Sequence, residues 1–238
     1  MAGHSKWANI KHKKAKEDAK KGKVFTKLIK EITIVARQGG GNPDQNPRLR
    51  LLLEKSKEAN MPLENVTRAI KKGIGELPGM SYEEYTYEGY APCGIAIVVD
   101  ALTDNKNRTV AEFRRLFSEN GGTLGDAGSV SWMFEKVGAV HATGTLTEDE
   151  LLEHLIEYDI KDIDIADDND YTIYCDIKSL ELVKTAVEKA GMKIESAGIE
   201  WLAKTKTELS EAQADKVLAF LSEVQDHDDV RNVYTNLS

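Results

Sequence analysis

The sequence predicts an α+β protein of several domains, in which an N-terminal three-helix bundle with a basic arm precedes two small α/β domains of the ferredoxin-like type. Three observations support this prediction. The chain of 238 residues exceeds the usual size of a single domain. The spacing of apolar residues changes from helical to strand-like near residue 81. Finally, residues 1–72 contain 18 Lys and Arg against 7 Asp and Glu, a net charge of +11, whereas residues 73–238 carry −19.

The basic arm comprises residues 1–22. Between Lys6 and Lys30 the sequence holds ten lysines and only two acidic residues, Glu17 and Asp18. Few apolar side chains interrupt this run, so burial of the arm would not offset the entropy lost on ordering it. We therefore expect the arm to be mobile or only weakly helical in the free protein and to become ordered against a partner.

The helical bundle is expected over residues 23–76. Apolar side chains recur there at spacings of three and four, which is typical of amphipathic helices. The glycines at 39–41 end the first helix, Asn60 is a candidate N-cap of the third, and Gly73 ends that third helix. The expected helices cover residues 24–36, 47–59 and 60–72.

A linker over residues 73–81 leads into the α/β region, where alternating apolar residues indicate strands. The first group of elements is a strand at 82–90, a strand at 94–102, a helix at 109–119 and a strand at 128–136. The second group has the βαββαβ order of a ferredoxin-like domain. Its elements are expected at 138–143, 148–158, 160–166, 171–177, 180–190 and 193–201.

The C-terminal segment adds a helix at 211–224 and a strand at 230–237. These two elements would complete the sheet of the first group, so we expect one α/β domain from residues 81–136 plus 205–238. Residues 137–204 then form an inserted ferredoxin-like domain. Two consecutive α/β domains without this cross-connection would fit the same pattern.

No pattern of catalytic or metal-binding residues stands out. Cys93 and Cys175 are isolated from each other and lack zinc-site spacing, so we expect both to be buried and reduced. The glycines of 121–128 follow a helix and precede a strand, which favours a turn over a phosphate loop. The aspartates of 162–170 and of 226–229 do not match a calcium loop, and solvated loop carboxylates are the favoured interpretation. We therefore predict a protein that is not an enzyme and needs no cofactor or metal, with a Mg²⁺-dependent enzyme as a distant alternative.

No run of apolar residues approaches the 18 or so needed for a membrane-spanning helix. The N-terminus also lacks the continuous apolar stretch of a secretion signal. A cytoplasmic protein without a membrane partner is the expectation.

The basic segment predicts contact with a polyanion, since lysines neutralise backbone phosphates. A short lysine tract is often only a solvated tail, but Trp7 and Ile10 lie inside this one, and an exposed indole can stack on a base. Packing of Trp7 on the protein's own helices remains open, as does a helix-dipole role for the cations at the end of the third helix. The candidate nucleic-acid-binding residues are Lys6, Trp7, Lys11, Lys13, Lys14, Lys16, Lys20, Lys21, Lys23, Lys27, Arg68, Lys71 and Lys72.

Short motifs along nearly the whole chain carry a resemblance to a known family. The most distinctive is the opening Ala-Gly-His-Ser-Lys-Trp-Ala-Asn-Ile-Lys at residues 2–11. Others lie at residues 22–32, 41–43, 46–49, 59–62, 70–73, 87–94, 107–109 and 121–122. On these motifs the chain resembles the YebC/PmpR family, which also includes the mitochondrial translational activator of cytochrome oxidase subunit I.

The resemblance implies a helical N-terminal domain followed by two α/β domains, in a non-enzymatic cytoplasmic protein. It implies either a DNA-binding regulator of transcription or a factor that acts on RNA and ribosomes during translation. We take the DNA-binding transcriptional regulator as the primary hypothesis and the ribosome-bound or RNA-binding translation factor as the alternative. The sequence indicates neither the recognised base sequence nor the oligomeric state.

Overall fold

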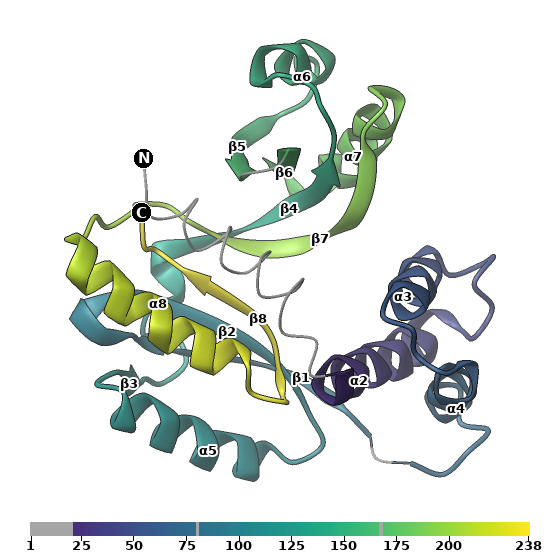
Figure 1. Cartoon of the computed structure of the whole chain (residues 1–238), viewed down its shortest axis with the longest axis horizontal. Helices are drawn as coiled ribbons and strands as arrows, with labels where there is room; N and C mark the ends of the chain where they lie inside the picture. The colour runs from purple at the N-terminus through teal and green to yellow at the C-terminus, as the bar shows by residue number, and fades with distance from the viewer. Residues whose placement is uncertain (1–20, 80, 167–168) are drawn as a thin grey trace.

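The computed structural model of the chain describes residues 21–79, 81–166 and 169–238. In this part of the chain a helical bundle is followed by two four-stranded sheets, each covered by helices (Figure 1). This arrangement confirms the predicted fold class, an α+β protein with an N-terminal bundle and two small α/β units.

The bundle consists of α2 (Lys21–Gly39), α3 (Pro47–Glu58) and α4 (Leu63–Gly73). Its core is built from Ile32, Leu49 and Val66, all of which are buried. Asn46 fixes the turn between the first two helices. Its side-chain oxygen accepts from the backbone N–H of Leu49, and its amide nitrogen donates to two carbonyls at the end of α2. The connection is therefore held by a buried N-cap that satisfies the ends of both helices.

Two details of the bundle differ from the sequence prediction. Lys21 and Gly22, assigned to the arm, are the first residues of α2, so the helix starts earlier than expected. Asn60 is not the N-cap of α4, because its φ of 57° places it in the left-handed turn after α3, and Pro62 occupies the capping position instead. Both Asn and Pro are frequent at helix boundaries, and tertiary packing decides which of them marks the start.

Gly73 is required where α4 crosses α2. A Cβ atom at this position would lie 2.8 Å from Ala36 Cβ and would also collide with the carbonyl oxygen of Thr33. We expect Gly73→Ala to lower the free energy of unfolding by about 1–3 kcal/mol, because the overlap forces the two helices apart. The control is Gly22→Ala, where nothing lies within 4 Å and the change should stabilise α2 by at most about 1 kcal/mol. Equal effects of the two substitutions in urea unfolding would contradict this account.

The first sheet has the strand order β3-β1-β2-β8, with all neighbours antiparallel. Helices α5 and α8 cover one face of it, and Phe113, Phe117 and Leu221 fill the core between helices and sheet. The elements of this unit are β1 (Glu83–Tyr90), η1 (Pro92–Gly94), β2 (Ala96–Thr103), α5 (Lys106–Glu119), β3 (Thr123–Leu124), α8 (Glu211–Gln225) and β8 (Val230–Thr235).

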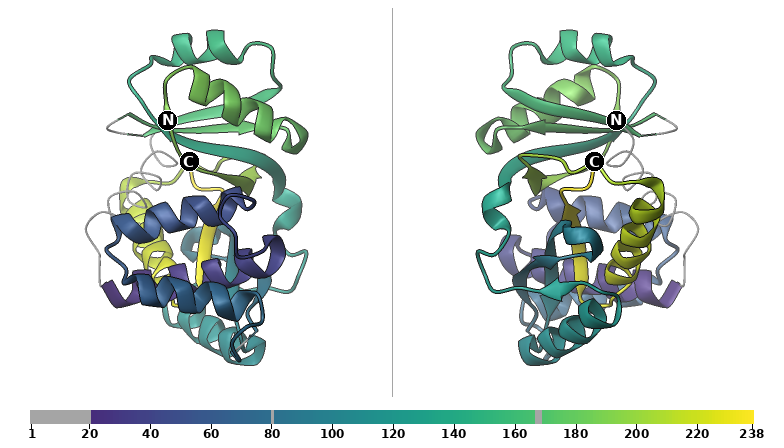
Figure 2. Two further views of the ribbon diagram at one scale, coloured as in Figure 1. Left: turned by 90° about the vertical axis from the view of Figure 1, so that its right-hand side faces the viewer. Right: turned by 90° about the vertical axis from the view of Figure 1, so that its left-hand side faces the viewer.

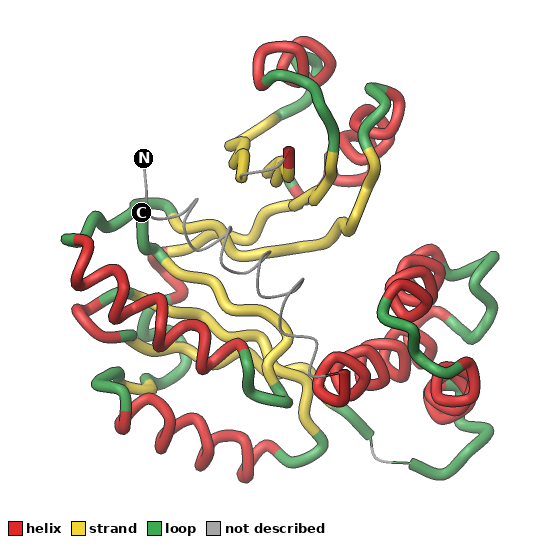
Figure 3. The backbone as a smooth tube through the Cα atoms, viewed as in Figure 1, coloured by secondary structure: helices red, strands yellow, loops and turns green. Residues whose placement is uncertain are grey.

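The second sheet has the order β5-β6-β4-β7, again fully antiparallel (Figure 3). The order of elements along the chain is βαββαβ, which together with this strand order gives the ferredoxin-like topology that the sequence predicts. The elements are η2 (Ser131–Met133), β4 (Phe134–Thr143), α6 (Glu148–Leu155), β5 (Ile160–Ala166), β6 (Asp170–Cys175), η4 (Ile177–Ser179), α7 (Leu180–Lys189) and β7 (Lys193–Ala203).

The chain leaves the first sheet after β3, builds the second sheet, and returns with β8 to pair with β2. The strands expected at 128–136 and 138–143 were wrong as separate elements. Residues 128–133 form a turn and the 3-10 helix η2, and a single strand, β4, then runs from Phe134 to Thr143, so the domain limit placed at residues 136 and 137 falls inside a strand. The exact domain limits remain a prediction.

The two sheets contact each other through a small apolar cluster. Ala96, Val98 and Tyr234 of the first sheet pack against Phe134 and Ala203, where β4 begins and β7 ends. In both views of Figure 2 the second sheet and its helices lie above the first sheet, and the bundle packs beside the first sheet. The bundle therefore contacts the α/β region mainly at the first sheet, which contains β1 and β8, the first and last strands of that region.

Two further expectations concern cysteines and membranes. Cys175 is buried as expected, but Cys93 is exposed, because it occupies a tight turn with a φ of 62°. None of the helices that the structure describes combines the length and hydropathy needed to cross a bilayer.

Candidate nucleic-acid interface

Helix α2 contacts a different part of the protein with each of two faces. Thr33 and Ala36 face α4, where Thr33 Oγ1 donates to the carbonyl of Ala69. Lys23, Lys27 and Lys30, at spacings of four and three, line the opposite face and point toward the end of α8. The lysines at the start of α2 thus belong to the contact between the bundle and the first α/β unit.

Lys23 and Lys27 bind the C-terminal end of α8. Lys23 Nζ donates to the carbonyl of Asp226 at 3.2 Å, and Lys27 Nζ donates to that of Gln225 at 2.5 Å. The carbonyls at the end of a helix lie at the negative end of its dipole, so they attract cations. Burial lowers the pKa of Lys27 from 10.5 to about 8, against the opposing influence of Asp226 and Asp228. The contact therefore holds the Lys27 ammonium partly away from water.

Lys30 forms the innermost contact of this row. Its Nζ lies 2.5 Å from Asp229 Oδ1 and 3.0 Å from the carbonyl oxygen of Asp228. Lys30 is 7% exposed and Asp229 is 3% exposed. A buried ion pair therefore lies between the bundle and the loop that precedes β8.

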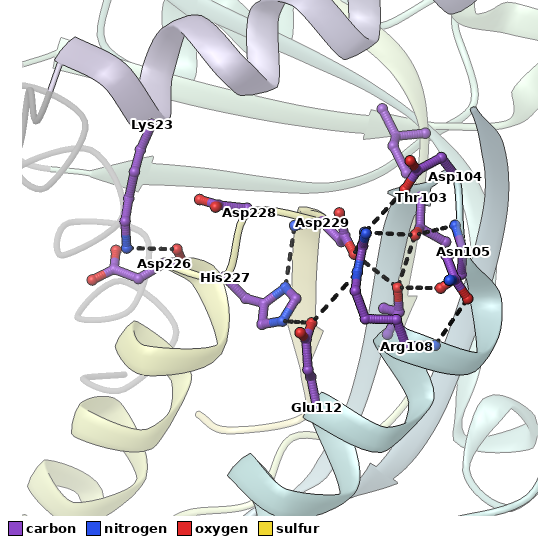
Figure 4. Close-up of polar contacts among 12 residues, drawn as sticks. Lys23, Thr103, Asp104, Asn105, Arg108, Glu112, Asp226, His227, Asp228 and Asp229 are labelled. Atoms are coloured by element: carbon purple, nitrogen blue, oxygen red, sulfur yellow. Dashed lines mark hydrogen bonds and ion pairs between the residues drawn. The ribbon is translucent and has the colours of Figure 1, made fainter. Parts of the chain in front are cut away.

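Asp229 is held by three donors, one from α2 and two from α5. Besides Lys30, Thr109 Oγ1 donates to Asp229 Oδ2 at 2.7 Å and Arg108 donates to the same oxygen at 3.0 Å (Figure 4). Burial alone would raise the pKa of Asp229, but the hydrogen bonds from Lys30, Thr109 and Arg108 outweigh it and lower that pKa to about 2. Asp229 is thus the ionised centre of a network that joins α2 and α5 to the loop before β8.

This network corrects the expectation that the aspartates of 226–229 are solvated loop carboxylates, since Asp229 is buried. Glu112, His227 and Asp229 also form a group whose ligand atoms lie within 4.8 Å of one another, a spacing that suits a metal ion. However, His227 Nε2 lies 3.0 Å from Glu112, and Nδ1 accepts from the backbone N–H of Asp229 (Figure 4). Two cations already neutralise Asp229, so the contacts of this group fit an ion-pair network better than a metal site.

The lowered pKa of Asp229 predicts a specific loss of stability in acid. The carboxylate is favoured in the folded state, so its contribution is fully present above about pH 4 and disappears as the pH falls through about 2. We expect the difference in free energy of unfolding between the wild type and Asp229→Asn to be constant from pH 8 to 5 and to shrink below pH 4. Urea unfolding followed by tryptophan fluorescence measures it. A difference that persists undiminished at pH 2 would contradict the assignment.

The remaining predicted site residues of the described chain lie on α4. Arg68, Lys71 and Lys72 are exposed, and Arg68 forms an i,i+4 ion pair with Glu64 at 2.9 Å. Because α4 packs on the face of α2 turned away from α8, the structure does not join these three cations with Lys23 and Lys27 in one patch. Lys21 is the first residue of α2. Outside the described residues lie Lys6, Trp7, Lys11, Lys13, Lys14, Lys16 and Lys20.

Lys30, Arg108 and Asp229 were not among the site residues predicted from the sequence. Lys30 was hidden in a run of lysines, although its spacing from Lys23 and Lys27 already placed it on the same helical face. Asp229 directly precedes a predicted strand, and that position was the only signal that it could enter the core. Its partner Arg108 is 121 residues away along the chain, so spacing alone could not connect the two.

Comparison with known proteins agrees with this architecture. The family model described as "TACO1/YebC protein N-terminal domain" matches residues 5–76, and that described as "TACO1/YebC second and third domain" matches residues 82–237. A "Probable transcriptional regulatory protein" of Caldanaerobacter subterraneus subsp. tengcongensis is 51% identical over 239 residues, covering 100% of this chain and 98% of the relative. A protein of the same description from Persephonella marina is 50% identical, covering 99% and 95%.

The fold has also been solved experimentally in a relative. The crystal structure of "a Conserved Hypothetical Protein Aq1575 from Aquifex Aeolicus" superposes with a TM-score of 0.85 at 46% identity, covering 98% of this chain and 96% of that one. Both family models together span nearly the whole sequence. The chain therefore belongs to the TACO1/YebC family.

Proposed function

We propose that the protein is a non-enzymatic nucleic-acid-binding regulator that acts on transcription by binding DNA. The observation that carries this proposal is the separation of charge, +11 in residues 1–72 and −19 in residues 73–238. The acidic units repel phosphates and the basic segment attracts them, so a polyanion is directed to the N-terminal part. The names of the relatives as transcriptional regulatory proteins support the same assignment.

In this proposal the lysines of the arm bind backbone phosphates and Trp7 stacks on a base. Arg68, Lys71 and Lys72, which are exposed on α4, provide a second, separate group of phosphate contacts. Phosphate contacts position a protein without reading the base sequence, so specificity requires further contacts or a partner.

The test compares duplex DNA with RNA. Fluorescence anisotropy with a DNA duplex, a single-stranded RNA and an RNA hairpin of equal length measures affinity at one salt concentration, and crosslinking in cells followed by sequencing identifies the bound sites. Enrichment of discrete DNA regions supports the proposal. Crosslinks confined to ribosomal or messenger RNA would replace it with the translation factor.

A further inference from the structure

We propose that the face of α2 that carries Lys23, Lys27 and Lys30 is a latch, closed on the end of α8 in the free protein and opened by the polyanion that binds the N-terminal segment. The latch comprises these three lysines together with Gln225, Asp226, Asp228 and Asp229. The proposal rests on the proposed function, because it describes how the binding of nucleic acid is regulated.

In the closed state the latch lysines already have partners. Lys23 and Lys27 each donate to a carbonyl of α8, and Lys30 reaches a carbonyl and a carboxylate. The order of burial follows the helix, since Lys23 is exposed, Lys27 is half-buried and Lys30 is buried. A ligand held by the arm therefore meets the most accessible lysine first and the buried ion pair last.

Phosphate is a stronger partner than the carbonyls it would replace. A helix C-terminus presents about half an elementary charge, whereas a phosphate presents a full one, so the Coulomb attraction for an ammonium is larger at a phosphate. The Lys27 ammonium also regains contact with water on release, which removes the cost of its burial. Exchange of α8 for a polyanion is therefore favourable at these two positions.

The closed state excludes a polyanion from the same lysines. A cavity of about 650 Å³ is lined by six carboxylates, among them Glu112, Glu223 and Asp228, against three cations, Lys23, Arg108 and Arg115. A phosphate chain that approached Lys23 there would face these carboxylates at close range. Full use of the lysine face therefore requires the bundle to move away from α8.

The open state leaves the central carboxylate satisfied. When Lys30 departs, Asp229 keeps its hydrogen bonds from Thr109 and Arg108. The other polar side-chain contacts of α2 with the α/β region lie at or near the surface: Arg37 donates to Ser81 and to the carbonyl of Tyr82, and the partly exposed Glu31 lies 3.9 Å from Arg231. Exposed contacts of this kind contribute little, so the latch provides the main polar attachment of α2.

The first experiment measures opening directly in the full-length chain. Spin labels are attached at Lys57→Cys in α3 and Lys216→Cys in α8, both exposed positions. The native exposed thiol is removed by Cys93→Asn, because Asn tolerates the left-handed backbone there. Pulsed electron resonance then gives the distance between labels with and without a 20-base-pair DNA duplex, while anisotropy reports binding on the same samples. We expect the distance distribution to shift to longer values on binding.

The two proposals fail in different ways in this experiment. Absence of DNA binding would overturn the proposed function, whereas binding with an unchanged distance distribution would overturn the latch alone. A shift that appears only on binding supports both.

The second experiment uses linkage. Asp229→Asn weakens the closed state without removing a proposed phosphate contact, so it should increase the affinity for duplex DNA about five- to tenfold. Asp228→Asn is the matched control, since it removes the same charge from the adjacent residue, whose side chain is exposed. Equal effects of the two variants would show that the affinity rises only because a negative charge is lost from the protein, and would overturn the latch.

Discussion

Asp229→Asn should lower the free energy of unfolding by about 3–5 kcal/mol, the largest effect on stability that we expect from a single polar substitution in this protein. The asparagine fills the same space but carries no charge, so the buried ammonium of Lys30 loses its counter-ion. Its amide group would also point hydrogens toward Lys30 or toward Arg108, which are themselves donors and cannot accept. Urea unfolding at pH 7 gives the value.

Asp228→Asn provides the comparison for stability as well. The side chain of Asp228 is exposed, and only its backbone carbonyl contacts Lys30, so the change should cost less than about 0.5 kcal/mol. If both variants unfolded at the same midpoint urea concentration as the wild type, the buried network would not stabilise the contact between α2 and the loop before β8.

Replacing Lys11, Lys13 and Lys14 together by Gln should weaken binding to duplex DNA by on the order of a hundredfold at about 0.1 M salt. Each phosphate contact that is lost lowers the slope of log affinity against log salt by about 0.9, so the slope should become shallower by about 3. Anisotropy titrations at several salt concentrations measure both quantities.

The control for the arm substitutions changes the same number of charges elsewhere. Lys178, Lys189 and Lys216 are exposed on the acidic α/β region, and their replacement by Gln should leave the slope unchanged. A loss of affinity as large as that caused by the arm variant would mean that net charge, and not the arm, governs binding.

Much of the fold follows from local sequence patterns. The three helices of the bundle and the βαββαβ order were predicted correctly because each depends on the spacing of apolar residues within one element. A helix boundary was predicted wrongly where two neighbouring residues both suit the N-cap position. Asn60 and Pro62 both suit a helix start, and only packing against α2 decided that α4 begins at Leu63.

The features that failed depend on contacts between distant segments. The join of two expected strands into β4 is set by pairing with β7 along its whole length. The burial of Asp229 depends on Lys30 and Arg108, which approach it from other elements. A lysine tract likewise has the same appearance in sequence whether its side chains meet phosphate or the end of a helix, so Lys23 and Lys27 could not be placed from the sequence.

The affinity of the intact protein for nucleic acid as a function of salt tests the central claim most directly. If the N-terminal segment neutralises six to ten phosphates, affinity should fall roughly 10³- to 10⁵-fold between about 50 and 200 mM salt. Titrations with duplex DNA, RNA and ribosomes that show no binding in dilute buffer, or binding that salt leaves unchanged, would contradict a function based on the basic segment.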